Sequence, residues 1–254
     1  MPATVTLIGI EGLPDIRPGD DLARLTVQAA QAQGTPLADG DVLVVTQKVV
    51  SKAEARLVKL TTVEPSALAR EFAEAWDKDA RVVELALREA KRVIRMDNGV
   101  LITETRHGFR CANSGVDASN VGPEGEETVA LLPLDPDSSA RAFRQDISNV
   151  AGADVAVIIS DTFGRPWREG AENVAVGVAG MKALRDYKGE QDNYGRELQS
   201  TTIAVADELA AAAELVTNKL TRVPVAIVRG YPYQPGGAEG VKPLIREAAK
   251  DLFR

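Results

Sequence analysis

The chain contains one cysteine, Cys111, and one histidine, His107. A single thiol excludes an internal disulfide and a metal site built from several thiolates, and one histidine excludes the H-E-x-x-H pattern of many zinc enzymes. No apolar run approaches the ~18 residues that span a membrane as a helix, and the N-terminus has neither the basic start nor the apolar segment of a cleaved signal. We therefore expect a cytoplasmic protein that does not enter a membrane.

Basic residues are in the minority, with 30 Lys and Arg against 37 Asp and Glu and a formal net charge of -7. This balance argues against general nucleic-acid binding, which needs clustered basic side chains, although it leaves room for a local basic pocket. Two common glycine motifs of nucleotide sites, G-x-x-x-x-G-K-[ST] and a strand-linked G-x-G-x-x-G, are absent. The usual sequence signatures of nucleotide and zinc enzymes therefore do not apply.

Hydrophobic residues make up 44% of the 254, enough for a sizeable core in one large domain or two joined lobes. Periodicity and turn residues predict strands at residues 5–10, 41–45, 100–103, 128–132, 155–159 and 225–228. Helices are predicted at 22–32, twice between 65 and 91, at 138–150, at 203–216 and at the C-terminal end as far as Phe253. Because the two types do not alternate regularly, we predict a single domain over 1–254 with a second lobe near 75–170.

For two of these helices the sequence also predicts a capping residue or a buried face. Asp20 or Asp21 is placed to cap the first one. The helix that follows residue 65 is expected to bury one face, formed by Leu68, Phe72, Ala75 and Trp76.

Polar residues follow the apolar strand at 41–45, where the sequence continues as TQKVVSKAE over residues 46–54. Lys48 and Lys52 are four residues apart, and ammonium groups at the end of a strand suit anionic phosphate oxygens. The alternative is that both lysines are ordinary solvated surface residues.

A second polar cluster occupies residues 106–120. Its side chains Asn113, Asp117 and Asn120 could bind a hard cation through oxygen, or could satisfy the backbone of their own loop as Asx turns. The histidine of this cluster, His107, is expected to be structural, because a lone histidine is more often hydrogen-bonded than catalytic.

A third cluster, residues 160–168, begins where the apolar strand at 155–159 ends, which is a standard place for ligand-binding groups. Its alternative is a turn in which Asp161 caps and Arg165 is exposed.

A fourth cluster, residues 180–195, alternates acids and glycines and taken alone indicates a mobile surface loop. Together the clusters supply lysines for phosphates, acids for a metal ion and arginines for an anionic substrate, an inventory that fits metal-assisted phosphoryl transfer.

The ordered motifs resemble those of the coenzyme F420-0:gamma-glutamyl ligases nearly from end to end. They are EGLP at 11–14, TQKVVSKAE at 46–54, CANSGVDASN at 111–120, SDTFGRPWR at 160–168 and RG at 229–230. The resemblance implies an α+β fold with mixed, intertwined sheets in two lobes, a homodimer, and a groove near the dimer interface. The pattern ends close to Arg254, so we expect the single-domain form of the family, which does not reduce the coenzyme.

The resemblance also implies an activity. The family joins L-glutamate to the phospholactyl carboxylate of coenzyme F420-0 and extends the tail by gamma-glutamyl links, using GTP, an acyl phosphate and two divalent ions, Mg²⁺ or Mn²⁺. Two other functions stay open: a regulatory module that binds GTP and metal without catalysis, and an amide ligase that acts on another carboxylate.

Site residues follow from the resemblance position by position. Lys48 and Lys52 are expected to be catalytic and, with Gln47, to lie near the phosphates. The metal ligands are expected to be Asp117 and Asp161 for one ion, Thr162 for a second, and Asn218. The nucleotide contacts are expected to include Leu13, Pro14, Asp15, Ile16, Asn120 and Asn218, although Asp15 departs from the more usual apolar residue.

Overall fold

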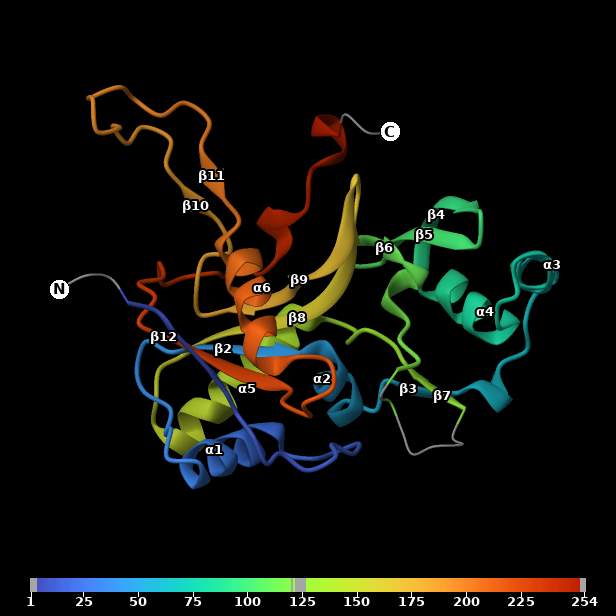
Figure 1. The fold of residues 1–254 in the computed structure, drawn as a ribbon, viewed down its shortest axis with the longest axis horizontal. Coiled ribbons are helices and arrows are strands. Elements are labelled where there is room, and N and C mark those ends of the chain that lie inside the picture. Colours follow the sequence, from blue (N-terminus) through green and yellow to red (C-terminus); the bar gives the residue numbers. More distant parts are fainter. Residues whose placement is uncertain (1–3, 120, 122–126, 252–254) are drawn as a thin grey trace.

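The computed structural model describes residues 4–119, 121 and 127–251. Its centre is a five-stranded mixed sheet (Figure 1). In spatial order the strands are β1 (Thr6–Gly9), β12 (Val225–Arg229), β2 (Val42–Thr46), β8 (Ala156–Arg165) and β9 (Arg168–Ala179). Only β2 and β8 run parallel. The α+β prediction is confirmed.

The apolar runs of the sequence form the buried centre of this sheet. Side chains from Val42 to Val45, from Ala156 to Ile159 and from Val225 to Val228 are at most 2% exposed. A strand covered on both faces needs apolar side chains on both, which explains why these runs are continuous rather than alternating.

Helices cover both faces of the sheet (Figure 1). On one face α1 (Leu22–Ala32) packs against α5 (Pro136–Ala151), and on the other α6 (Val205–Thr217) crosses β1, β12 and β9. The side chain of Asp21, not that of Asp20, caps α1 by accepting a hydrogen bond from the N–H of Arg24. A capping carboxylate satisfies one of the free N–H groups at a helix start.

A smaller group of elements packs beside the sheet and has two hydrophobic clusters of its own, built from residues between Val58 and Leu131. Its helices are α3 (Ala67–Trp76) and α4 (Ala80–Glu89), and it includes the short turns Leu60–Thr62 and Asn113–Gly115. Helix α2 (Gln47–Ala53) leads into it from β2. Its strands are β3 (Leu57–Lys59), β7 (Thr128–Ala130), β4 (Ala90–Asp97), β5 (Val100–Thr105) and β6 (Arg110–Ala112). Helix α5 and strand β8 belong to the main core instead, and the lobe boundaries near 75–170 stay a prediction.

The face predicted for α3 is wrong in part. Leu68 and Trp76 are 52% and 41% exposed and Ala75 is exposed as well, whereas Ala69, Phe72 and Ala73 are buried. The small alanines allow α3 to lie close to α4, so the buried stripe is rotated toward them and away from the larger side chains.

The third polar cluster is a continuation of a strand rather than a loop after it. Strand β8 runs on through Arg165 and pairs with β9 as a long hairpin, with a bulge between Ile159 and Ser160. Residues past the bulge lose the continuous apolar pattern because the hairpin leaves the covered sheet (Figure 1). Its base is tightly packed: a Cβ on Gly177 would lie 2.4 Å from the carbonyl oxygen of Pro136.

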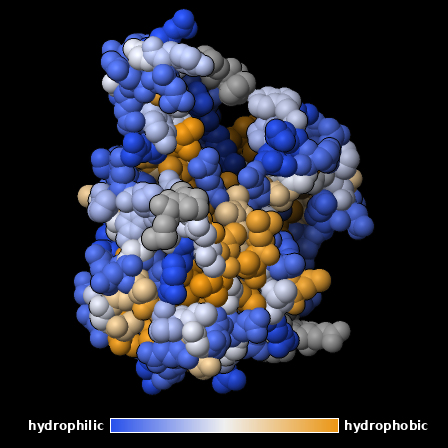
Figure 2. All heavy atoms as spheres, turned by 60° about the vertical axis from the view of Figure 1, so that its left-hand side comes forward, coloured by the Kyte–Doolittle hydropathy of each residue, from blue (hydrophilic) through white to orange (hydrophobic). Residues whose placement is uncertain are grey.

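The fourth polar cluster contains short β structure. Strand β10 (Arg185–Asp186) pairs with β11 (Thr202–Ile203), and together they form an arm that projects from the body (Figure 1). Figure 2 shows that the arm's surface is largely hydrophilic, whereas apolar side chains gather on the body beneath it. Among the exposed apolar side chains are Leu215 of α6 and Val5 before β1, at 79% and 47% exposure.

The predicted C-terminal helix is absent from the described residues up to 251, and Phe253 lies outside them. Only two short turns occur there, Lys242–Leu244 and Ala248–Lys250. Pro243 removes a backbone donor. Ile245 leaves the first turn with an extended backbone and, like Leu244, packs against the main core, so the two turns do not join into one helix. Within the described residues, no helix combines the length and apolar character that crossing a membrane requires.

The RG motif at 229–230 has a structural role. Arg229 forms two hydrogen bonds to the carboxylate of Asp41, at 2.8 and 2.7 Å, and Asp41 is only 1% exposed. A Cβ on Gly230 would lie 2.5 Å from the carbonyl oxygen of Thr4. The motif therefore closes the edge of the sheet where β12 meets the N-terminal segment.

Candidate active site

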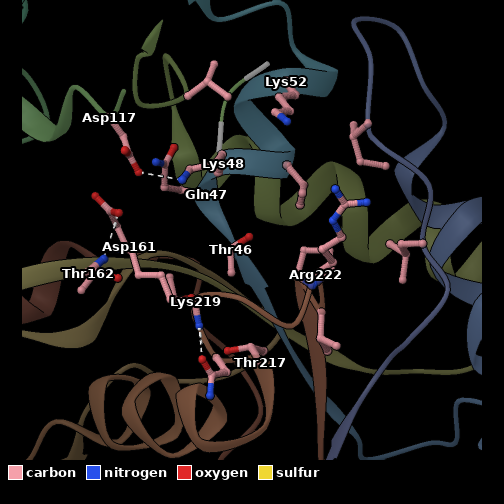
Figure 3. A pocket seen from close by; sticks show the side chains of 18 of the residues that line it. Thr46, Gln47, Lys48, Lys52, Asp117, Asp161, Thr162, Thr217, Lys219 and Arg222 are labelled. Atoms are coloured by element: carbon pink, nitrogen blue, oxygen red, sulfur yellow. Dashed lines mark hydrogen bonds and ion pairs between the residues drawn. The ribbon is translucent and has the colours of Figure 1, made fainter. Parts of the chain in front are cut away.

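A cavity of about 760 Å³ lies at the edge of the sheet where β2 and β8 leave the core (Figure 3). Five segments line it: the loop before α1, the start of α2, the segment that carries Asp117 and Val121, the polar part of the β8–β9 hairpin, and the end of α6 with the loop that follows. All of the predicted site residues that the structure describes line this cavity, namely Leu13, Pro14, Asp15, Ile16, Gln47, Lys48, Lys52, Asp117, Asp161, Thr162 and Asn218. Asn120 lies outside the described residues.

Strand pairing brings the first and third clusters together. Thr46, the last residue of β2, lies opposite Ser160 in the parallel ladder. Because neighbouring parallel strands end at one edge of a sheet, the residues after Thr46 and Ser160 enter the same space. The predicted phosphate-binding and metal-binding groups are thus adjacent although they are more than 100 residues apart in the chain.

The two lysines project from the first turns of α2. Lys48 is not a solvated surface lysine: its side chain is 18% exposed and its Nζ lies 2.9 Å from Oδ2 of Asp117. Lys52, one turn later, points into the cavity (Figure 3). Burial lowers the pKa of Lys52, partly offset by the charge of Asp15. The start of α2 is fixed by Gln47, which is 2% exposed and accepts a hydrogen bond from Ser51.

The Asx turn that the sequence offered for Asp117 is present, and metal binding by this residue stays a prediction. Its Oδ1 accepts hydrogen bonds from the N–H and hydroxyl of Ser119, both at 2.7 Å, as in an Asx turn. Its Oδ2 faces Lys48 across the cavity (Figure 3). Burial raises the pKa of Asp117, but the bonds from Lys48 and Ser119 outweigh it, so the pKa lies below its usual value. Asp117 is therefore held as a carboxylate.

Asp161 lies on β8 facing the same space. Burial raises its pKa from 3.8 to about 7, and the charge of Asp117 adds to this effect, while the N–H of Thr162 donates to Asp161 and opposes it. The alternative interpretation, a turn capped by Asp161, is wrong, because the residue is inside a strand. Arg165 is paired with Glu172 rather than free in solvent.

Sequence reasoning missed a pair of polar residues behind Thr162. The hydroxyl of Thr162 donates to Oδ1 of Asn173 at 2.7 Å, and Nδ2 of Asn173 donates to Oε2 of Glu214 at 2.5 Å. Asn173 is 4% exposed although its strand neighbours at 168–172 are all exposed. An Asn on β9 and a Glu on an Ala-rich helix match no short motif, so only tertiary structure could connect them.

The cavity also holds basic residues that the motif comparison did not select: Arg17, Lys219 and Arg222. Lys219 is near enough to Asp161 for its charge to lower that carboxyl's pKa. The neighbouring Asn218 follows the last residue of α6 with a positive φ of 51°, and its Oδ1 accepts the N–H of Lys219 at 2.6 Å. These cations make one wall of an otherwise acidic molecule suitable for polyanionic ligands.

Oxygen donors in the cavity fit a magnesium-type cation. The charge of Asp117 helps to raise the pKa of Asp161, so it makes a second carboxylate here costly, a cost that a cation would relieve. No cluster of three or more His, Cys, Asp or Glu side chains suited to a metal occurs in the described part of the chain. Mg²⁺ does not need one, because it is usually held by one or two carboxylates together with waters and substrate phosphates.

The lone histidine lies outside this cavity, as the structural interpretation predicted. Nε2 of His107 lies 3.0 and 3.1 Å from the carbonyl oxygens of Pro133 and Leu134, and its ring stacks on Phe109. Cys111 is buried, and burial raises the pKa of its thiol to about 12. Neither residue is available for chemistry at the cavity.

Comparison with known proteins decides the family. Residues 11–230 match the F420-0:Gamma-glutamyl ligase family. The chain belongs to this family.

Several named relatives match over almost their whole length. A protein of Methanothermobacter thermautotrophicus named coenzyme F420:L-glutamate ligase is 48% identical over 252 residues, 98% of this chain and 99% of that protein. Proteins of the same name from Methanopyrus kandleri and Methanocaldococcus jannaschii are 46% and 42% identical over 94% and 98% of this chain, and over 93% and 97% of their own lengths. The similarity therefore includes every element that lines the cavity.

Proposed function

We propose that this F420-0:gamma-glutamyl ligase family member adds L-glutamate to the phospholactyl carboxylate of coenzyme F420-0 and extends the tail by gamma-glutamyl links. The observation that carries the proposal is the meeting of Lys48, Lys52, Asp117 and Asp161 in one cavity of about 760 Å³, which is large enough for a nucleotide. The names of the near-full-length relatives supply the substrate.

Amide formation from a carboxylate needs activation, because a carboxylate is a poor electrophile. GTP is the proposed activator: the substrate carboxylate attacks its γ-phosphorus and GDP leaves, which gives an acyl phosphate. The α-amine of glutamate then attacks the acyl carbon, the amide forms, and inorganic phosphate leaves with its electron pair. The amine's proton is released to a base, for which no residue is assigned.

The chain's own residues would bind and orient these groups. Lys48 and Lys52 would face the phosphate oxygens, with Gln47 beside them, and a positive charge placed where phosphate charge develops stabilises the transition state by several kcal/mol. Residues 13–16, with Asn218 and Asn120, would surround the rest of the nucleotide. Asp117 and Asp161 would hold one divalent ion, Mg²⁺ or Mn²⁺, and Thr162 a second. These ions neutralise charge on the transferring phosphoryl group when they are bound.

Two other parts of the proposal concern the whole molecule. We infer a homodimer, in keeping with the exposed Leu215 and Val5, because exposed apolar side chains on a protein body are often covered by a partner. The proposed location is the cytoplasm, in keeping with a single, buried cysteine.

The decisive experiment is to incubate the protein with coenzyme F420-0, L-glutamate, GTP and Mn²⁺ and to measure the product mass. Addition of one or more glutamyl residues, with GDP and phosphate released, supports the ligase. GTP and metal binding without any product would favour a regulatory module. A product formed only when another carboxylate replaces F420-0 would favour a ligase of different specificity.

A further inference from the structure

Thr162, Asn173 and Glu214 form a short line of hydrogen bonds in the wall of the cavity. Thr162 and Asn173 lie directly opposite each other in the β8–β9 ladder, so their side chains are on the same face of the hairpin. Glu214 reaches them from the last turn of α6, which packs on that face. The amide of Asn173 is thus held between a hydroxyl and a carboxylate.

The direction of each hydrogen bond in this line follows from the chemistry of the three groups. An ionised carboxylate only accepts hydrogen bonds, so Glu214 must face the NH₂ group of Asn173. The Oδ1 of Asn173 then faces Thr162, and an amide oxygen also only accepts. Consequently the Thr162 hydroxyl donates its proton to Oδ1 of Asn173, and the lone pairs of Thr162 Oγ1 face a group in the cavity.

We propose that Asn173 is a positioning residue, which holds Oγ1 of Thr162 as an oxygen ligand for a divalent cation. Glu214 fixes the orientation of the Asn173 amide, with its NH₂ group toward Glu214 and its oxygen toward Thr162. This inference rests on the proposed function, in which Thr162 binds the second ion. The alternative orientation, with the hydroxyl proton pointing into the cavity, would repel a cation and would suit a phosphate oxygen instead.

The strand geometry supports a separate role for Thr162. Successive side chains on a strand point to opposite faces, so Asp161 and Thr162 project to different sides of β8. The charges of Asp117 and Lys48 act on Asp161, whereas Thr162 is hydrogen-bonded to Asn173, which is bonded in turn to Glu214. Each of these two proposed ligands would thus have its own set of supporting residues.

The test is a double-mutant cycle that measures Mn²⁺ affinity rather than turnover. Mn²⁺ is titrated into the full-length protein with a saturating non-hydrolysable GTP analogue, and free Mn²⁺ is followed by its EPR signal. Loss of a residue that orients a metal ligand typically weakens metal affinity about 10- to 100-fold. Asn173→Ala should therefore weaken binding of one ion at least ~10-fold, but should change it less than about 2-fold in the Thr162→Val background.

The polarity argument has its own variant. Glu214→Gln keeps the shape and lets Asn173 reverse its amide, so the correctly oriented fraction of Thr162 falls and Mn²⁺ affinity falls at least ~2-fold. This loss should also disappear in the Thr162→Val background. Glu208→Gln is the matched control, because it removes the same charge from the exposed side of the same helix. Thermal denaturation of each variant separates a metal effect from a folding defect.

Each outcome decides a different question. Equal losses from Asn173→Ala with and without the Thr162 hydroxyl would overturn the positioning role while leaving the proposed metal dependence intact. If the loss of Mn²⁺ affinity from Glu214→Gln persists in the Thr162→Val background, Glu214 acts by attracting the cation through its charge. That result would overturn its role in orienting the Asn173 amide. If the wild-type protein binds no Mn²⁺ with the analogue, both this inference and the proposed metal site fail.

Discussion

Asp161 should destabilise the metal-free fold, and replacing it should make the protein more stable but inactive. Its folded-state pKa of about 7 lies above the ordinary value of 3.8, because the carboxylate is buried near Asp117. Folding therefore favours the protonated carboxyl, so the free energy of unfolding falls as pH rises from about 4 to about 7. At about 1.4 kcal/mol per pH unit, the full penalty above pH 7 is about 4 kcal/mol.

Asp161→Asn removes the charge and keeps an oxygen that accepts the N–H of Thr162. In EDTA at pH 8, urea denaturation should show the variant more stable than wild type, and the gain should shrink by about 3 kcal/mol at pH 5, where the wild-type carboxyl is mostly protonated. Mn²⁺ should raise the stability of the wild type and have much less effect on the variant. Catalysis should be lost at ordinary metal concentrations.

The control is Asp146→Asn, which removes one exposed carboxylate of α5 away from the cavity. It should leave the free energy of unfolding nearly unchanged at both pH values. The reasoning is refuted if Asp161→Asn and wild type lose stability in parallel between pH 5 and pH 8, because the carboxyl then carries no burial penalty.

Four further outcomes are expected. Lys52→Ala should fold normally and lower kcat/KM for GTP about 100-fold or more, and steady-state kinetics with wild-type rates would instead make it an ordinary surface lysine. GTP should support glutamate addition much better than ATP, and equal rates in the mass assay would contradict the nucleotide assignment. Arg229→Met should cost about 3–5 kcal/mol in urea denaturation because it leaves the buried carboxylate of Asp41 unpaired, and adding Asp41→Asn should recover much of that loss. Gly177→Ala should lower stability by about 1–3 kcal/mol because its Cβ would meet a backbone oxygen, whereas Gly164→Ala, with nothing within 4 Å, should not share that steric loss.

Local patterns predicted the main elements well where burial sets the pattern. The apolar runs became β2, the first half of β8 and β12, and the Ala-rich segment became α6. Prediction was poorer where burial is one-sided or absent. The polar half of β8, the strand β4 and the short pair in the arm carry no apolar alternation strong enough to distinguish a strand from a loop.

The candidate site was found through motifs whose residues are adjacent in sequence, and its described members do line one cavity. The motifs did not show which atom of each side chain makes which contact. Whether Asp117 forms a turn or binds a cation was left open, and the structure shows one oxygen in an Asx turn and the other paired with Lys48. Arg229 belonged to the motif that carried the resemblance, yet it supports the sheet edge rather than the cavity.

The sequence by itself determined the class of fold, the polar clusters and the family, because each depends on the type and order of neighbouring residues. Tertiary structure alone decided that Asn173 lies behind Thr162 and that Glu214 lies behind Asn173, 41 positions away along the chain. The physical reason is that these hydrogen bonds depend on the strand register and on how α6 packs against the hairpin. Both are set by packing between segments distant in sequence.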